Sequence, residues 1–157
     1  MQDTKILVTG SSGMLGSQFA QELKQFVSVF KLPEEVDIRV ESPLKEELKK
    51  ISPDIIIHTA AYTDVDGCEL NPKSAYKVNV AGTENIVKFC RSINTKTKLV
   101  FISSTGVYGD TSKANYSEND VPKPTTVHHK NKLEAENIIR NTLHNSLIVR
   151  VGWLYGG

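Results

Sequence analysis

A short apolar run that leads directly into three closely spaced glycines constrains the fold of this chain more than any other feature. Residues 5–9 have the composition of a buried strand, and Gly10, Gly13 and Gly16 follow before an apolar periodicity typical of a helix. A strand that turns through such glycines into a helix opens a doubly wound α/β fold. The first glycine permits the tight turn, the second lets the backbone approach a pyrophosphate, and the third lets the helix pack closely.

This glycine-rich turn predicts a dinucleotide site, because the N–H groups at the start of the helix would face the phosphate charge. A simple turn without a ligand is the alternative, since glycine triplets also occur by chance. The context of strand, turn and helix favours the dinucleotide. The residues expected to line this part of the site are Gly10, Ser12, Gly13, Met14, Leu15 and Gly16.

Length and composition limit the classes of protein to which this sequence can belong. The chain has 157 residues, which indicates one domain over 1–157, and 39% of them are hydrophobic, enough for a sizeable core. A formal net charge of +1 and the lack of a basic cluster give no indication of a nucleic-acid partner. No apolar run is long enough to span a bilayer, and Cys68 and Cys90 lack metal-ligand spacing. We therefore expect a cytoplasmic domain with no metal, no nucleic acid and no membrane contact.

Apolar runs and helical periodicities alternate along the rest of the chain. Strands are predicted at 27–30, 36–38, 54–59, 98–102 and 147–151, helices at 42–51, 72–92 and 126–143, and a polar loop at 103–125. Such alternation predicts an α/β fold, a doubly wound parallel sheet of about six strands covered by helices on both faces. Six strands complete a Rossmann fold of this kind, so we expect the substrate-binding C-terminal half to be absent from this chain.

Several stretches of the sequence carry a resemblance to a known family. They are Val8–Gly16, Pro53–Thr63, Ile102–Tyr108 and Arg150–Tyr155, together with Asp37, Ile38, Asn79 and Lys132. In these motifs the chain resembles the extended short-chain dehydrogenase/reductase family, and most closely its dTDP-4-dehydrorhamnose reductase branch. The resemblance implies an NAD(P)-dependent oxidoreductase that acts on a nucleotide sugar.

The resemblance also implies roles for residues outside the glycine-rich turn. Asp37 and Ile38 are expected to contact the adenine, and the Asn79 position supports the catalytic lysine in such enzymes. Without a ligand, Asp37 would be a solvated loop carboxylate and Asn79 a helix-surface amide. The residues expected to lie along the cofactor after the strand at 54–59 are Ala60, Ala61 and Tyr62.

The catalytic residues that the resemblance implies are present with one exception. The family uses a serine or threonine, a tyrosine, and a lysine four residues after that tyrosine. Ser104 and Lys132 fit the first and last roles, but His128 stands at the tyrosine position. None of the five tyrosines has a lysine four residues on. Thr105 and Gly106 also depart from the branch, which commonly has Asp and Tyr there.

The exchange of tyrosine for His128 bears on how a proton would be delivered. Reduction of a carbonyl needs a proton donor, and a histidine has an unperturbed pKa of about 6.5. A spacing of four places His128 and Lys132 on one face of a helix, where the like charge disfavours the imidazolium. We therefore expect a mostly neutral His128 at pH 7, a weaker acid than the imidazolium. A polar helix start without chemistry is the alternative.

The choice between NAD and NADP depends on the end of the second predicted strand. An acidic residue usually binds the ribose 2′-OH there, but in this sequence the region from Val29 onward has no acidic residue until Glu34. Lys31 would suit a 2′-phosphate better than a hydroxyl, so NADP is favoured over NAD. A solvated loop lysine is the alternative.

Three functions remain open at this point. The chain could be an active reductase with His128 as its proton donor, a non-catalytic dinucleotide-binding module or regulatory subunit, or a truncated inactive form of the enzyme. The family often dimerises through its two long helices, here 72–92 and 126–143. The first of these carries more apolar residues than one buried face needs, which suggests a homodimer: Val78, Ile86, Val87, Phe89 and Cys90.

Overall fold

A parallel β-sheet forms the centre of the molecule. The computed structural model describes residues 4–93, 96–109 and 115–156, and in these ranges the sheet has five strands in the order β2-β1-β3-β4-β5. Every neighbouring pair is parallel, and the strand order runs outward from β1 in both directions, as in a doubly wound fold. The predicted fold class is confirmed, with five strands in place of six. The strands are β1 (Lys5–Thr9), β2 (Ser28–Lys31), β3 (Ile55–His58), β4 (Lys98–Ser104) and β5 (Ser146–Val151).

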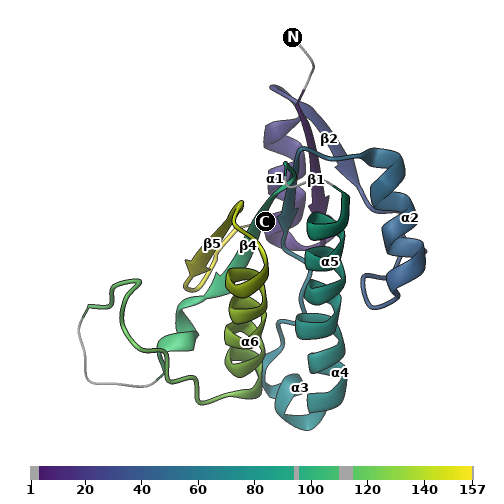
Figure 1. Cartoon of the computed structure of the whole chain (residues 1–157). Helices are drawn as coiled ribbons and strands as arrows, with labels where there is room; N and C mark the ends of the chain where they lie inside the picture. The colour runs from purple at the N-terminus through teal and green to yellow at the C-terminus, as the bar shows by residue number, and fades with distance from the viewer. Residues whose placement is uncertain (1–3, 94–95, 110–114, 157) are drawn as a thin grey trace.

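Helices cover both faces of this sheet. Figure 1 shows α2, α5 and α6 side by side over one face, and α1 on the other. The helical segments are α1 (Met14–Leu23), α2 (Glu41–Ile51), α3 (Val65–Leu70), α4 (Pro72–Tyr76), the π-helix η1 (Lys77–Gly82), α5 (Thr83–Ile93), the 3-10 helix η2 (Thr105–Tyr108) and α6 (Val127–Thr142). Within the described residues, no helix is long and apolar enough to cross a membrane.

The larger apolar core lies between the sheet and the face that carries α2, α5 and α6. Leu7, Ile56 and Phe101 point into it from the strands. Their neighbours Ile6 and Ile57 pack toward α1 instead, because successive side chains of a strand point to opposite faces. This alternation explains why the strands read as continuous apolar runs in the sequence.

The apolar residues that suggested a homodimer lie inside the chain's own core. Ile86, Val87, Phe89 and Cys90 are each no more than 2% exposed, and Val78 packs against the same core. These side chains therefore fill the space between α5, its neighbouring helices and the sheet. The homodimer stays a prediction, without support from these residues.

Residues 36–38, which we predicted to be a strand, pair with no other strand of the described sheet. Their backbone is irregular and then turns. The Ile38 side chain packs onto Gly82, where a Cβ would lie 2.8 Å from it, and its carbonyl accepts a hydrogen bond from Asn85 Nδ2 at 3.0 Å. The apolar residue thus anchors a loop, which a short apolar run cannot distinguish from a strand.

The helix predicted at 72–92 consists of three consecutive helical segments, α4, η1 and α5. A separate helix, α3, precedes it and is capped by Asp64, whose carboxylate accepts a hydrogen bond from Gly67 N at 2.9 Å. The long helix itself passes through the π-helical segment η1 between α4 and α5. The loop predicted at 103–125 begins with the last residues of β4 and with η2, and its residues 110–114 lie outside the described residues.

Candidate functional site

A cleft of about 1250 Å³ runs along the carboxyl ends of the strands. Its walls come from the turn after β1, the loops after β2 and β3, the end of β4 with η2, the first turns of α6, and the segment after β5. Open α/β sheets bind their ligands at this edge. The predicted site residues therefore have to be located relative to this cleft.

The glycine-rich turn brings β1, β3 and α1 closer together than side chains would allow. Gly10 has a φ of 66°, a left-handed conformation that favours glycine. A Cβ on Gly16 would overlap the Gly10 carbonyl oxygen and lie 2.7 Å from Thr59 Oγ1. The Thr59 hydroxyl also donates to the Thr9 carbonyl oxygen at 2.6 Å, which fixes the end of β3 against the turn. The backbone of the turn is therefore open to the cleft.

The amino end of α1 completes a cradle that fits a pyrophosphate. Gly13 is the N-cap, so no cap side chain occupies the N–H groups of the first turn. These groups and the positive end of the helix dipole favour a bound anion. All six residues predicted for this part of the site line the cleft: Gly10, Ser12, Gly13, Met14, Leu15 and Gly16.

The predicted adenosine-binding residues line the same cleft. Lys31 is exposed at the end of β2, and Asp37 and Ile38 follow in the next loop. Arg39 holds the Asp37 carboxylate, with Nη2 2.6 Å from Oδ2. The hydrogen bond from the Arg39 side chain lowers the pKa of Asp37, so this carboxylate is an ionised acceptor at neutral pH.

The loop after β3 places Ala60 and Ala61 on the cleft, but the described lining residues do not include Tyr62. The Tyr62 backbone is instead fixed from behind by Asn79, a buried residue of η1. Asn79 Oδ1 accepts from Tyr62 N at 2.8 Å, and Asn79 Nδ2 donates to Tyr62 O at 3.0 Å. Asn79, expected to support Lys132, therefore orders the loop after β3 in this structure.

A second buried residue, His58, stabilises the fold behind the cleft. Its Nδ1 lies 2.7 Å from Thr9 Oγ1 and its Nε2 lies 3.0 Å from Thr83 Oγ1. Burial, followed by the charge of Lys132, lowers the pKa of His58 to about 3. The ring is thus a neutral core histidine that joins the ends of β1 and β3 to the start of α5.

Ser104 and Lys132 meet at the cleft from different elements. Ser104 ends β4, and its Oγ accepts a hydrogen bond from Gly106 N at 3.1 Å. Lys132 is 5% exposed on α6, donates from Nζ to the Ile102 carbonyl at 2.9 Å, and places Nζ 4.7 Å from the centre of the Phe101 ring. Burial lowers the pKa of Lys132 to about 8. Both residues line the cleft, and their catalytic roles stay predictions.

His128 also lines the cleft, one turn before Lys132 on α6. Its ring is buried, and Nδ1 lies 3.0 Å from the carbonyl oxygen of Tyr62. Burial and, next, the Lys132 charge lower the pKa of His128 to about 4. The expectation of a neutral ring at pH 7 agrees with this direction, although burial contributes more than the like charge.

Sequence reasoning missed several residues of the cleft wall. The most informative is His129, which we treated only as part of a polar helix start. Its ring packs against Gly106, where any Cβ would overlap it. The adjacency of two histidines at a helix start beside the lysine was the available signal. Other lining residues outside the prediction include Thr59, Thr63, Ser103, Thr105, Gly106 and Trp153.

Comparison with known proteins places these features in a family. The family described as the RmlD substrate binding domain matches residues 4–157. The chain is 32% identical over 155 residues to the spore coat polysaccharide biosynthesis protein SpsK of Bacillus subtilis, over 98% of this chain and 54% of that protein. It is 31% identical to the dTDP-4-dehydrorhamnose reductase of Aggregatibacter actinomycetemcomitans, over 97% of this chain and 52% of the relative.

Solved structures resemble the fold closely. The dTDP-4-dehydrorhamnose reductase of Bacillus anthracis, in complex with NADP, has a TM-score of 0.93 and 30% identity, over 99% of this chain and 56% of that chain. The UDP-glucose 4-epimerase of Thermus thermophilus, in complex with NAD, has a TM-score of 0.83 over 94% of this chain and 54% of that chain. At 23% identity the epimerase shows the fold alone.

The fold and the cleft define an α/β protein of the Rossmann class. Within that class, the chain belongs to the RmlD substrate-binding domain family. It spans about half the length of the curated relatives that it matches.

Proposed function

We propose that this chain is the dinucleotide-binding part of an NAD(P)-dependent oxidoreductase that acts on a nucleotide sugar, similar to the dTDP-4-dehydrorhamnose reductases. The observation that carries the proposal is the convergence of the glycine-rich cradle, Ser104 and Lys132 on one cleft. The dinucleotide, when bound, supplies or accepts the hydride. The names of the relatives and the NADP complex of the Bacillus anthracis enzyme support it.

The cradle and the loops after β2 and β3 would hold the dinucleotide. The open backbone from Gly10 to Gly16 and the amino end of α1 would bind the pyrophosphate. Asp37 and Ile38 would contact the adenosine, and Ala60 and Ala61 would lie along the cofactor. Tyr62 would act through its backbone, which Asn79 holds in place.

Two residues of the proposed active site present hydrogen-bond donors to the cleft. Ser104 Oγ already accepts from Gly106 N, so its own hydrogen is free to donate to a substrate carbonyl oxygen and polarise it. Lys132 Nζ donates one hydrogen bond to the Ile102 carbonyl, and its remaining N–H donors can bind the nicotinamide ribose. His128 stands where the family has its tyrosine, within reach of the same cleft.

Lys31 favours NADP over NAD in this proposal. It is exposed on the cleft wall, and the nearest acidic residue of that loop that lines the cleft is Glu34. A lysine ammonium attracts the charged 2′-phosphate of NADP more strongly than the neutral 2′-hydroxyl of NAD. We place the activity in the cytoplasm, where Cys68 and Cys90, both free and buried, would stay reduced.

Titration of the purified chain with NADPH and with NADH, followed by fluorescence, tests the proposal. We expect saturable binding of both, with NADPH the tighter ligand. ATP serves as the control, because it shares the adenosine and a phosphate chain but has no nicotinamide. A folded chain that binds neither reduced dinucleotide would overturn the proposal.

A dinucleotide-binding module without turnover is a second candidate, and one observation favours it. The Nδ1 atom of His128 is engaged by the Tyr62 carbonyl, so the residue at the tyrosine position is not a free acid. Incubation with NADPH and dTDP-4-dehydrorhamnose separates the two functions. Oxidation of NADPH that depends on the sugar indicates the enzyme, and binding without oxidation indicates the module.

A further inference from the structure

The hydrogen bond of His128 fixes which of its ring nitrogens carries a proton. A carbonyl oxygen can only accept, so the 3.0 Å contact between Nδ1 and Tyr62 O requires a hydrogen on Nδ1. A neutral imidazole has one N–H, and Nε2 of His128 is therefore unprotonated. His128 lines the cleft, and an unprotonated Nε2 can only accept a hydrogen bond there.

His129 has the opposite arrangement. The N-cap hydroxyl of Thr126 accepts from His129 N at 3.2 Å and lies 2.9 Å from His129 Nδ1. While its oxygen accepts from the backbone N–H, the hydroxyl can donate its own hydrogen to Nδ1, and we assign this direction to the contact. The neutral ring of His129 then carries its hydrogen on Nε2.

The His129 ring packs against Gly106 on the cleft wall, because Gly106 has no side chain to exclude it. A Cβ on Gly106 would overlap the ring, and His129 Nε2 is the atom that it would approach most closely. The backbone N–H of Gly106 in turn donates to Ser104 Oγ. Ser104, Gly106 and His129 therefore form one continuous stretch of the cleft wall.

We infer that His129, through Nε2–H and together with the Ser104 hydroxyl, binds the carbonyl oxygen of the substrate, and that His128 is a positioning residue. The inference rests on the proposed function, since it needs a carbonyl substrate in this cleft. His128 holds the loop after β3 against α6 through the Tyr62 carbonyl. Two donors that bind one oxygen would stabilise the negative charge that develops there when a hydride adds to the carbonyl carbon, and a neutral imidazole can provide such a donor. The alkoxide would then take its proton from His129 Nε2–H, and the ring would regain a proton from solvent.

The protonated nitrogens can be identified without any ligand. Long-range ¹⁵N–¹H correlation spectra of the ¹⁵N-labelled chain at pH 7.5 distinguish the two tautomers of each ring. His128→Gln and His129→Gln variants assign the signals. We expect a hydrogen on Nδ1 of His128 and on Nε2 of His129. A His129 ring with its hydrogen on Nδ1 would overturn the inference.

Substitution then separates this inference from the proposed function. His129→Phe keeps a ring against Gly106 but removes the donor, and we expect turnover of dTDP-4-dehydrorhamnose with NADPH to fall about 100-fold. NADPH affinity should stay within about twofold of the wild type, because the ring is not part of the glycine-rich cradle. His144→Phe, at an exposed histidine beyond α6, is the matched control and should change neither quantity.

The outcomes are distinct. Equal turnover in His129→Phe and wild type would overturn the role of His129 and leave the proposed function intact. Loss of NADPH binding by the wild type would overturn the proposed function itself. A folded wild type that binds NADPH without turnover would overturn the role of His129 in reduction and leave the dinucleotide site intact.

Discussion

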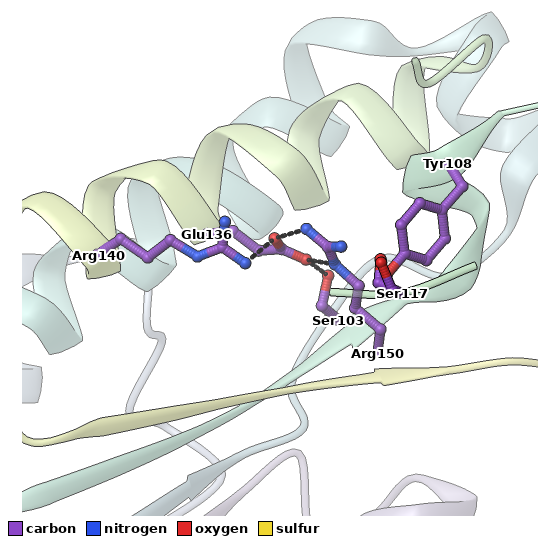
Figure 2. Close-up of polar contacts among 6 residues, drawn as sticks. All are labelled: Ser103, Tyr108, Ser117, Glu136, Arg140 and Arg150. Atoms are coloured by element: carbon purple, nitrogen blue, oxygen red, sulfur yellow. Dashed lines mark hydrogen bonds and ion pairs between the residues drawn. The ribbon is translucent and has the colours of Figure 1, made fainter. Parts of the chain in front are cut away.

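The carboxylate of Glu136 and the guanidinium of Arg150 form a two-point ion pair inside the protein. Glu136 Oε1 lies 2.9 Å from Arg150 Nε, and Oε2 lies 2.6 Å from Arg150 Nη2. Figure 2 shows Ser103 and Arg140 joined to the same carboxylate. Ser103 Oγ donates to Oε1 at 2.6 Å, and Arg140 Nη2 donates to Oε2 at 3.1 Å. Glu136 belongs to α6 and Arg150 to β5, so the pair ties the helix that carries His128, His129 and Lys132 to the edge of the sheet.

Removal of the Glu136 charge should destabilise the fold strongly. The side chain of Glu136 is fully buried and that of Arg150 is 8% exposed, so Glu136→Gln leaves a cation in the core without its partner. We expect the free energy of unfolding, measured by urea denaturation, to fall by about 3–5 kcal/mol. Desolvation of the orphaned guanidinium is the physical cause.

Glu84→Gln is the matched control for this change. Glu84 pairs with Lys88 at 3.5 Å on the surface of α5, and its side chain is 46% exposed. The same substitution there should cost no more than about 1 kcal/mol. Equal effects at the two glutamates would show that the buried pair makes no special contribution to stability.

The glycine-rich turn predicts different effects at two glycines. A Cβ on Gly16 would overlap the Gly10 carbonyl oxygen, a backbone atom that cannot move aside, whereas a Cβ on Gly13 would lie 3.3 Å from the same atom. Gly16→Ala should lower the free energy of unfolding by about 1–3 kcal/mol and weaken NADPH binding. Gly13→Ala should change stability by less than about 1 kcal/mol. Thermal unfolding and NADPH titration of both variants measure the difference, and equal stability of the two would contradict it.

Much of the fold could be predicted because its signals are local. β1, β3 and β5 lie within one or two residues of their predicted positions, since each is an apolar run bounded by polar residues or glycine. The loop at 36–38 was mistaken for a strand because its apolar residue packs onto Gly82, a contact that only the tertiary structure reveals. The short helix α3 was not predicted, because its six residues are too few to show a helical periodicity.

In the candidate site too, some features could be predicted from the sequence and others depend on contacts between distant residues. Ser104, His128 and Lys132 could be expected in one cleft, because the carboxyl ends of parallel strands and the amino ends of the following helices meet at one edge. The proton position on His128 could not be predicted, since it depends on a carbonyl 66 residues away in the sequence. Asn79 was assigned to Lys132 by resemblance, but its hydrogen bonds go to Tyr62.

The buried ammonium of Lys132 should make stability depend on alkaline pH. Burial lowers its pKa from 10.5 to about 8, so between these values the unfolded chain binds a proton that the folded chain has released. The free energy of unfolding therefore rises with pH across this window. We expect Lys132 to contribute a gain of about 3 kcal/mol between pH 8 and pH 10.5.

Urea denaturation of wild type and Lys132→Met at pH 7.5 and pH 10 isolates this contribution. Burial raises the pKa of Cys90 to about 12, so its thiol lowers stability as pH rises above 9.0, but it does so in both proteins. The difference between the two pH profiles therefore reports Lys132. Profiles that run parallel would show that the lysine titrates normally in the folded chain.

Charge reversal at Lys31 should change the preference between the two dinucleotides. Lys31 is exposed on the cleft wall, where its charge can attract a 2′-phosphate. Lys31→Glu replaces that attraction by a repulsion of similar size, each worth up to about 1 kcal/mol at an exposed position, so NADPH affinity should fall about tenfold. NADH lacks the phosphate and should bind within about twofold of its wild-type affinity.

Lys24→Glu makes the same change of net charge at an exposed residue that follows α1 and does not line the cleft. It should leave the ratio of NADPH to NADH affinity unchanged. The difference between the two variants should shrink as salt is raised from low to physiological ionic strength, because the interaction is between solvated charges. An unchanged affinity ratio in Lys31→Glu at low salt would mean that Lys31 is a solvated loop lysine, and that another group sets the choice of cofactor.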